Sequence, residues 1–234
     1  MLEINQHIQI FMYNIQILLM TLQMKIALPP EAFARIDETD DHLFYAEPRI
    51  VTHIDDNAIV AIKEFFDQTL PKDAVILDLM SSAFSHLPEG FPAQRVVGLG
   101  LNAVELQVNP ILDEYVIHDL NADPTLPFND GAFAAVIMTV SMQYLTKPVE
   151  VFREVHRILQ LGGPFVVIFS NRLFPTKAVY IWRVTSDAEH GKLVQHYFRL
   201  AGGYVEITFL DCTPQTDEYT DPVYIVMANK GEGP

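Results

Sequence analysis

Short apolar runs that alternate with helical patterns constrain the fold of this chain more than any other feature. Five such runs cover residues 74–78, 95–101, 115–120, 134–140 and 164–170. Because the early runs are almost continuously apolar, we expect strands that are buried on both faces, as in a parallel sheet covered by helices. Two later runs, 204–212 and 222–229, have no helix between them and predict an antiparallel pair. The predicted fold is therefore α/β, with a doubly wound, seven-stranded, mostly parallel sheet, an antiparallel last pair and the strand from Val75 in its middle.

The clearest helical pattern covers residues 148–163, with Pro148 near its start and Gly162 at a left-handed stop. Similar patterns predict helices over residues 52–70, 102–109, 176–185 and 189–203. We divide the chain into an N-terminal helix with an irregular lead-in, residues 1–44, and a main domain, residues 45–230.

Residues 1–28 are apolar, but glutamines and an asparagine interrupt them too often for a membrane span, and no signal-peptide pattern is present. Ile4, Ile8, Phe11 and Ile15 belong to one helical stripe. This stripe favours docking on the domain or on a second subunit, which would form a homo-oligomer. The alternative is a translated leader that ends before Met24.

Net charge and cysteine content indicate which classes of partner the protein binds and in which cellular compartment it lies. The formal net charge of −15 disfavours binding to nucleic acid and to anionic membranes. A single cysteine, Cys212, excludes an internal disulfide and fits a reducing compartment, so we expect a cytoplasmic protein. The histidines show no metal-ligand spacing on one element, and we predict no metal site.

The stretch from Asp119 to Phe169 carries an ordered set of motifs: "DLN", then "LPF", then the fourth predicted strand, then a helix that ends in "HRILQLGG". This set is similar to that of class I S-adenosylmethionine-dependent methyltransferases, in particular the small-molecule, type 11 group. The order and spacing extend from about Tyr45 to Asn229. The resemblance implies S-adenosylmethionine as cofactor and methyl transfer to a small soluble acceptor.

The sequence departs from this family where the cofactor chemistry is concentrated. The family's first motif, an acid followed by three alternating glycines, places its glycine positions on Met80, Ser82 and Phe84. In the family an acid at the end of the second strand hydrogen-bonds to both ribose hydroxyls, and that position is Gly100 here. We expect this glycine to leave space beside the strand. Glycine lets a ligand lie against the main chain, and methionine and phenylalanine do not.

Polar side chains offer a rebuilt cofactor site. Serine hydroxyls in the turn supply donors and acceptors, Asn102 and Glu105 follow the second strand, and the resemblance assigns Asp119 to the adenine amine. The purely structural alternatives are a helix N-cap for Asn102, a solvated helix charge for Glu105 and a loop cap for Asp119. The predicted cofactor-binding residues are Asp78, Ser81, Ser82, Ser85, Asn102, Glu105, Asp119, Leu120 and Asn121.

For the acceptor side we predict Tyr144, Gln143 and Arg172, which follow the fourth and fifth strands. Their alternatives are loop packing and, for Arg172, a salt bridge to a surface acid. His53 and His86 are candidate proton acceptors or structural histidines. The competing function is a non-catalytic ligand- or partner-binding module on the same fold. A dinucleotide oxidoreductase fits poorly because no GxGxxG turn is present.

Overall fold

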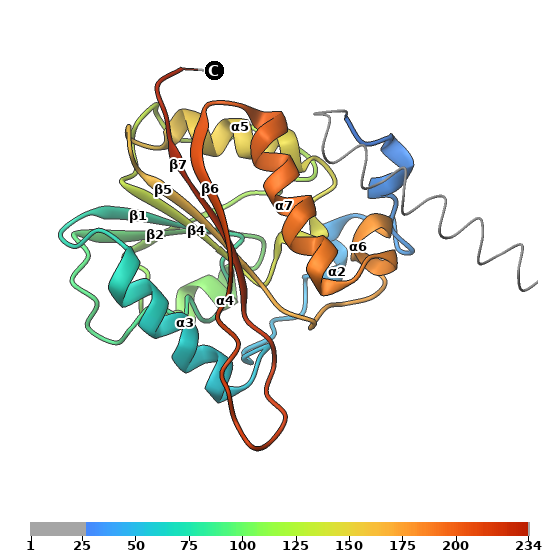
Figure 1. Ribbon diagram of the computed structural model, residues 1–234, viewed down its shortest axis with the longest axis horizontal. Coiled ribbons are helices and arrows are strands. Elements are labelled where there is room, and N and C mark those ends of the chain that lie inside the picture. The colour runs from blue at the N-terminus through green and yellow to red at the C-terminus, as the bar shows by residue number, and fades with distance from the viewer. Residues whose placement is uncertain (1–26, 234) are drawn as a thin grey trace, which may run out of the picture.

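Seven strands form one sheet in the order β3-β2-β1-β4-β5-β7-β6 in the computed structural model, which describes residues 27–233 (Figure 1). Strands β1 to β5 are parallel, and β7 runs antiparallel to both β5 and β6. The predicted topology, with β1 inside the sheet, is confirmed. The strands are β1 (Val75–Leu79), β2 (Arg95–Gly100), β3 (Glu114–Ile117), β4 (Ala135–Thr139), β5 (Pro164–Phe169), β6 (Tyr204–Asp211) and β7 (Tyr224–Lys230).

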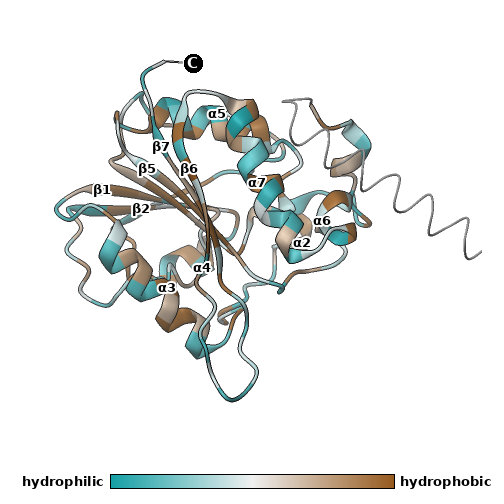
Figure 2. Cartoon of the chain, in the orientation of Figure 1, coloured by the Kyte–Doolittle hydropathy of each residue, from teal (hydrophilic) through white to brown (hydrophobic). Residues whose placement is uncertain are grey.

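Helices cover both faces of the sheet, and successive strand residues pack alternately against them. Along β4, Ala135 and Ile137 belong to the core that includes α3 (Asp56–Thr69). Val136 and Met138 belong to the opposite core, with α5 (Pro148–Ile158) and α7 (Asp187–Ala201). Figure 2 shows this pattern of burial: the central strands are hydrophobic along their length, whereas the helices have one polar side.

Local capping sets most helix boundaries. The Asp55 carboxylate accepts the Ala58 N–H at the start of α3, and Ser186 with Glu189 forms a capping box at the start of α7. The helix predicted over residues 176–185 is shorter: α6 covers only Tyr180–Val184. Val179 before it is extended and donates its N–H to the carbonyl of Gln143, which delays the helix.

Irregular backbone continues past the predicted boundary at residue 44, so the lead-in of the structure comprises residues 27–54, before α3 and its N-cap. The lead-in lies on the domain through short elements, η1 (Pro30–Phe33) and α2 (Asp41–Phe44). Backbone hydrogen bonds join it to the segment after β5. The Asp37 N–H donates to the Thr176 carbonyl at 2.9 Å, and the Tyr180 N–H donates to the Ala34 carbonyl at 2.7 Å. The helix and docking surface predicted for residues 1–23 lie outside the described residues. Among residues 27–233, no helix has the length and apolarity that a membrane crossing requires.

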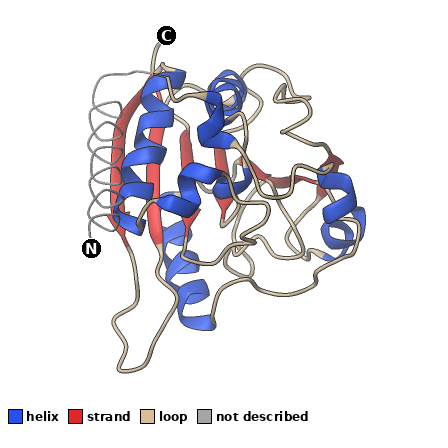
Figure 3. Cartoon of the chain, turned by 90° about the vertical axis from the view of Figure 1, so that its right-hand side faces the viewer, coloured by secondary structure: helices blue, strands red, loops and turns tan. Residues whose placement is uncertain are grey.

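A long loop, residues 212–223, joins β6 to β7 and projects from the body of the protein (Figures 1 and 3). It is fastened to the start of α3, because the Asp55 N–H donates to Asp221 Oδ2 at 3.0 Å and the Asp221 N–H donates to Asp55 Oδ2 at 2.6 Å. Asp221 is only 1% exposed, so the loop carries a buried carboxylate to the edge of the candidate site.

Candidate cofactor and acceptor site

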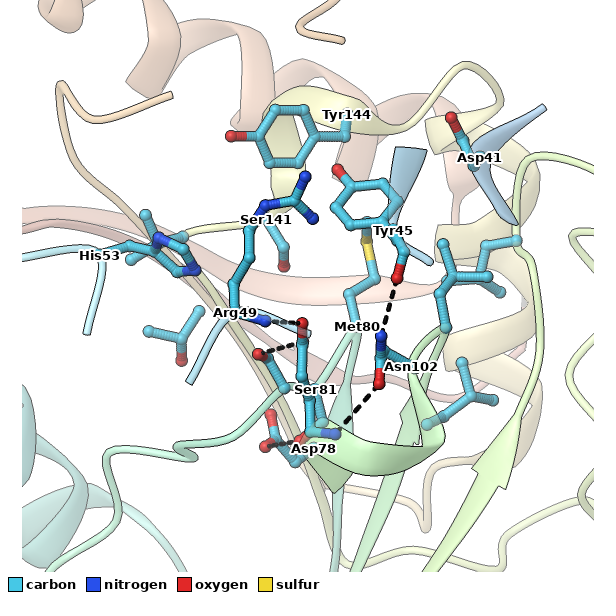
Figure 4. A pocket seen from close by; sticks show the side chains of 18 of the residues that line it. Asp41, Tyr45, Arg49, His53, Asp78, Met80, Ser81, Asn102, Ser141 and Tyr144 are labelled. Carbon is cyan, nitrogen blue, oxygen red and sulfur yellow. Dashed lines mark hydrogen bonds between the residues drawn. The ribbon is translucent and has the colours of Figure 1, made fainter. Parts of the chain in front are cut away.

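A cavity of about 290 Å³ lies where β1, β2 and β4 end, and the lead-in and the segment after β5 also line it (Figure 4). This is the position at which ligands bind in open α/β sheets. All the predicted site residues except Ser85 and Gln143 line this cavity. Those that do are Asp78, Ser81, Ser82, Asn102, Glu105, Asp119, Leu120, Asn121, Tyr144 and Arg172.

The turn after β1 keeps a glycine-like backbone without glycine. Met80 has φ +58°, in the left-handed region that glycine adopts at little cost. The Ser81 N–H then donates to the Leu99 carbonyl at 2.8 Å, which brings the turn against the end of β2. A Cβ added to Gly100 would lie 2.3 Å from the Ser81 carbonyl oxygen. The expectation that Gly100 leaves space is therefore wrong, since the backbone of the turn occupies it.

Asp78 is 3% exposed, and neighbouring serines hydrogen-bond to it. The Ser81 hydroxyl donates to Asp78 Oδ2 at 2.6 Å. Burial raises the pKa of Asp78 to about 7, although hydrogen bonds from Ser81 and Ser85 oppose the rise. Ser85 does not line the cavity: it is 2% exposed and also accepts a bond from Asn109. Its hydroxyl supports Asp78 and is not directed at a ligand.

Glu105 joins the turn to the lead-in. Its Oε2 accepts the Ser82 hydroxyl at 2.7 Å, and its Oε1 accepts the Arg49 N–H at 2.6 Å. The side chain is buried and lines the cavity, so it is not the solvated helix charge that was the structural alternative. Glu105 lines the same cavity as Gly100, the position on which the family's ribose acid falls.

Asn102 and Asp119 take their capping roles and still line the cavity. Asn102 Oδ1 accepts the first N–H groups of α4 (Ala103–Val108), while its amide donates to the carbonyls of Tyr45 and Ala46. Asp119 Oδ1 accepts the N–H groups of Asn121 and Ala122. Asp119 Oδ2 has no hydrogen-bond partner within residues 27–233.

The three predicted acceptor residues have different surroundings. Tyr144 is 8% exposed, accepts the Phe174 N–H at 2.8 Å and stacks on that ring, and burial raises its pKa to about 12. Gln143 lies outside the cavity lining and donates its amide to the carbonyls of Val140 and Arg172. Arg172 pairs with Asp221 at 2.7 Å, which is a salt bridge as in its alternative, but the partner is a buried acid and not a surface one.

Some cavity residues were not predicted. Arg49 reaches the cavity from the lead-in, and Thr139 and Ser141 reach it from the end of β4. The hydroxyls of Thr139 and Ser141 are buried and have no partner among the described residues. A signal for these two was present in the sequence, because Thr139 is the last residue of a buried strand and Ser141 follows two residues later. No comparable signal marked Arg49.

Backbone strain and low-pKa histidines also gather here. His86 and Val140 line the cavity with φ of +55° and +52°, and such conformations cluster at functional sites. Burial lowers the pKa of His53, and burial with nearby Lys63 lowers that of His86 to about 4. Both imidazoles are therefore neutral near pH 7.

A buried ion cluster holds the lead-in over the cavity. Asp41 is 4% exposed and accepts two bonds from Arg35, at 2.7 and 2.8 Å. Lys177, with no exposed surface, lies 3.1 Å from Asp41 and donates to the Thr39 carbonyl at 2.6 Å. Burial raises the pKa of Asp41, but a bond from Asn121 and these cations outweigh it and lower that pKa.

Three possible metal ligands, Asp40, His42 and Asp119, place their ligand atoms within 4.8 Å of one another at the outer edge of the site. Asp40 and His42 are exposed, the Asp40 carboxylate already accepts the His42 N–H, and Asp119 caps its loop. We assign no ion to this group, and the absence of a metal stays a prediction.

The comparisons with known proteins agree with this architecture. Residues 81–167 match the family model described as a methyltransferase domain. No curated protein sequence matches the chain.

Among solved structures, a methyltransferase from Thermotoga maritima has a TM-score of 0.56 at 15% identity, with 75% of this chain and 90% of that chain covered. The methyltransferase bound to the Trm112 activator of Haloferax volcanii has a TM-score of 0.54 at 17% identity, covering 74% and 90%. The [4+2]-cyclase SpnF has a TM-score of 0.53 at 16% identity, with 74% of this chain and 81% of that chain covered. The fold is thus shared with methyltransferases and with a cyclase. The match over residues 81–167 shows a methyltransferase domain in that part of the chain, and the seven-stranded sheet has the fold of the class I S-adenosylmethionine-dependent methyltransferases.

Proposed function

We propose that this chain transfers a methyl group from S-adenosylmethionine to a small soluble acceptor. The observation that carries the proposal is the set of carboxylates Asp78, Glu105 and Asp119, which line one cavity at the ends of β1, β2 and β3. The cofactor carries positive charge on its sulfonium and ammonium groups, and buried carboxylates complement such charge. Their position at the ends of neighbouring parallel strands, where ligands bind in open α/β sheets, supports the proposal.

The residues present fit the cofactor by the chemistry of their donors and acceptors. We assign Asp78 to the ammonium end, Glu105 to the ribose and the unpartnered Oδ2 of Asp119 to the adenine amine. The buried hydroxyls of Thr139 and Ser141 lack partners among the described residues, and a ligand would satisfy them. Leu120 supplies apolar contact, and Asn102 and Asn121 hold the loops that shape the site.

The serine turn has a modified role in this proposal. Ser81 and Ser82 donate their hydroxyl protons to Asp78 and Glu105, so they orient carboxylates and present only lone pairs to a ligand. Ser85 acts one step further away, through Asp78. The cofactor therefore meets acids that the serines position, in place of the backbone N–H groups that a glycine turn offers.

Bound S-adenosylmethionine supplies an electrophilic methyl group, and the chain contributes alignment of the acceptor and removal of a proton where the acceptor has one to lose. His53 lines the cavity with a lowered pKa, so its neutral imidazole is suited to accept that proton. Tyr144 is neutral because of its raised pKa and packs beside Phe174. Arg172 is held by Asp221 at the rim.

A second candidate is a non-catalytic ligand- or partner-binding module. The hydrogen bonds of the Ser81 and Ser82 hydroxyls favour this alternative, because both hydroxyls donate to carboxylates of the protein itself. The turn is therefore stable without hydrogen bonds to a cofactor. On this alternative the cavity would bind neither S-adenosylmethionine nor its demethylated product.

Calorimetric titration with S-adenosylmethionine and S-adenosylhomocysteine separates the two candidates. We expect binding of both, and a loss of about tenfold or more in affinity for Glu105→Gln, since a hydrogen bond to a charged group contributes about 1.5–3 kcal/mol. The matched control is Glu114→Gln, an exposed carboxylate on β3 outside the cavity. Absence of binding in the parent protein would reject the methyltransferase proposal, and equal losses in both variants would reject the assigned role of Glu105.

A further inference from the structure

Arg49 lies at the wall of the cavity (Figure 4), and three aromatic rings contact its guanidinium. Its guanidinium carbon lies 4.7 Å from the ring centroid of Phe44, 5.2 Å from that of Phe174 and 5.6 Å from that of Tyr45. Cations bind the faces of aromatic rings at such distances, and a planar guanidinium also stacks on them. The rings therefore fix the position of Arg49 without neutralising its charge.

The hydrogen bonds of Arg49 leave one buried nitrogen of its guanidinium without a partner. Its backbone N–H donates to Glu105, and Nη2 donates to the Phe44 carbonyl at 3.0 Å. Nη1 is buried and has no partner within residues 27–233, and no described carboxylate forms an ion pair with the guanidinium. A buried, charged donor without a partner is costly, so this position indicates a ligand that supplies an acceptor.

The free donor faces the acceptor side of the cavity. Arg49 is close enough to Tyr144 and His53 to affect the pKa of both. In Figure 4 its guanidinium points toward Ser141 and Tyr144 and away from Asp78. The unpartnered Ser141 hydroxyl gives a second donor on this side.

Charge favours an anion at this place and at no other part of the cavity. Asp78, Glu105 and Asp119 make the cofactor side acidic, and Arg172, the second arginine of the lining, is paired with Asp221. We propose that the methyl acceptor is a small carboxylic acid with a flat apolar body, whose carboxylate binds Arg49 and whose body packs against Tyr45, Tyr144 and Phe174. The inference rests on the proposed function and names its substrate class.

The cofactor's own carboxylate is the competing occupant of Arg49. That carboxylate shares a carbon with the ammonium group, which the proposed function assigns to Asp78. Because the guanidinium points away from Asp78, Arg49 is directed to the acceptor and not to the amino-acid end of the cofactor. The two occupants make opposite predictions for cofactor affinity.

The test titrates benzoate and 4-hydroxybenzoate into the protein, with benzamide and 4-hydroxybenzamide as neutral counterparts of the same shape. Each titration is run with the protein alone and with S-adenosylhomocysteine bound. We expect the acids to bind at least about tenfold more tightly than the amides, since the pair involves a charged hydrogen bond. Arg49→Met removes this preference and Arg49→Lys retains part of it, while the affinity for S-adenosylhomocysteine changes less than about threefold.

Arg95→Met is the matched control, because Arg95 lies at the start of β2, half exposed and outside the cavity. Thermal unfolding checks that each variant is folded. Equal binding of acids and amides, or binding of neither, overturns the proposed acceptor class. A tenfold loss of S-adenosylhomocysteine affinity in Arg49→Met would assign Arg49 to the cofactor, and this result also overturns the proposed acceptor class. If S-adenosylhomocysteine fails to bind the parent protein, the proposed function fails, and the titrations without it still decide whether Arg49 selects acids.

Discussion

The contact between Gly100 and the Ser81 carbonyl predicts that two alanine substitutions on the same strand differ sharply in cost. Gly98 and Gly100 both lie on β2, and both are buried. A Cβ on Gly98 would lie 2.4 Å from a methyl carbon of Leu112, whereas one on Gly100 would lie 2.3 Å from the Ser81 carbonyl oxygen. The gaps are nearly equal, but a leucine side chain rotates away and a backbone carbonyl inside a hydrogen-bonded turn does not.

The magnitudes follow from that difference. Replacing glycine by alanine in a strand gains about 0.5–1 kcal/mol of backbone entropy. At Gly98 this gain offsets a rotamer change of Leu112, which costs about 0.5–1.5 kcal/mol, so the net effect is within about 1 kcal/mol of zero. At Gly100, displacement of the turn costs about 1–3 kcal/mol, as overpacking of a tight core does. A loss of 2 kcal/mol lowers the melting temperature of a chain of this size by about 4–8 °C.

Urea unfolding of the parent, Gly98→Ala and Gly100→Ala, with the slope of the transition compared among them, measures these free energies. We expect Gly100→Ala to be less stable than Gly98→Ala by about 2 kcal/mol, with an unchanged slope. Equal stabilities, or a larger loss at Gly98, would refute the argument that the turn after β1 is fixed against β2. The same displacement moves Ser81 away from Asp78, so Gly100→Ala also weakens cofactor binding.

Two further predictions concern buried charges. Asp78 has a pKa of about 7, well above the value of an aspartate in an unfolded chain, so the native state binds more protons than the unfolded state between about pH 4 and 7. The free energy of unfolding should therefore fall as the pH rises to about 7 and Asp78 ionises. S-adenosylmethionine affinity should rise with pH up to about 7 and then level off, and calorimetry should find neither trend in Asp78→Asn. Asp41→Asn leaves Lys177 buried with less compensation and should cost about 3–5 kcal/mol, against about 0.5 kcal/mol for Arg95→Ala, whose pair with Glu114 is exposed. Chemical unfolding measures both losses, and a cost below 1 kcal/mol for Asp41→Asn would contradict the role of the ion cluster.

The parts of the fold that depend on local periodicity were predictable from the sequence. The apolar runs located β1, β2, β4 and β5, and Pro148 with the apolar face after it located α5. The antiparallel last pair followed from the absence of a helix between two strands. These features are set within a window of a few residues.

The candidate site was only partly predictable, because neighbours in sequence diverge in space. Ser85 and Gln143 stand beside cavity residues in the chain, but each is turned into the protein to support Asp78 and Arg172. The approach of Ser81 to Gly100 joins two strands and has no local signature. The position of Arg49 depends on how the irregular lead-in folds back over the sheet.

The cavity takes its two sides from different parts of the chain. The acids of the cofactor side lie on or beside residues 81–167, the span that matches the methyltransferase domain, whereas Asp41, Tyr45 and Arg49 come from the lead-in before it. On the proposed function, the wall that would contact the acceptor is thus separate in sequence from the part that would bind the cofactor. On that proposal, substitutions confined to the lead-in would change the acceptor while leaving the sheet intact. Relatives with the same domain core therefore cannot be assumed to share a substrate, and comparison of their lead-ins is the informative one.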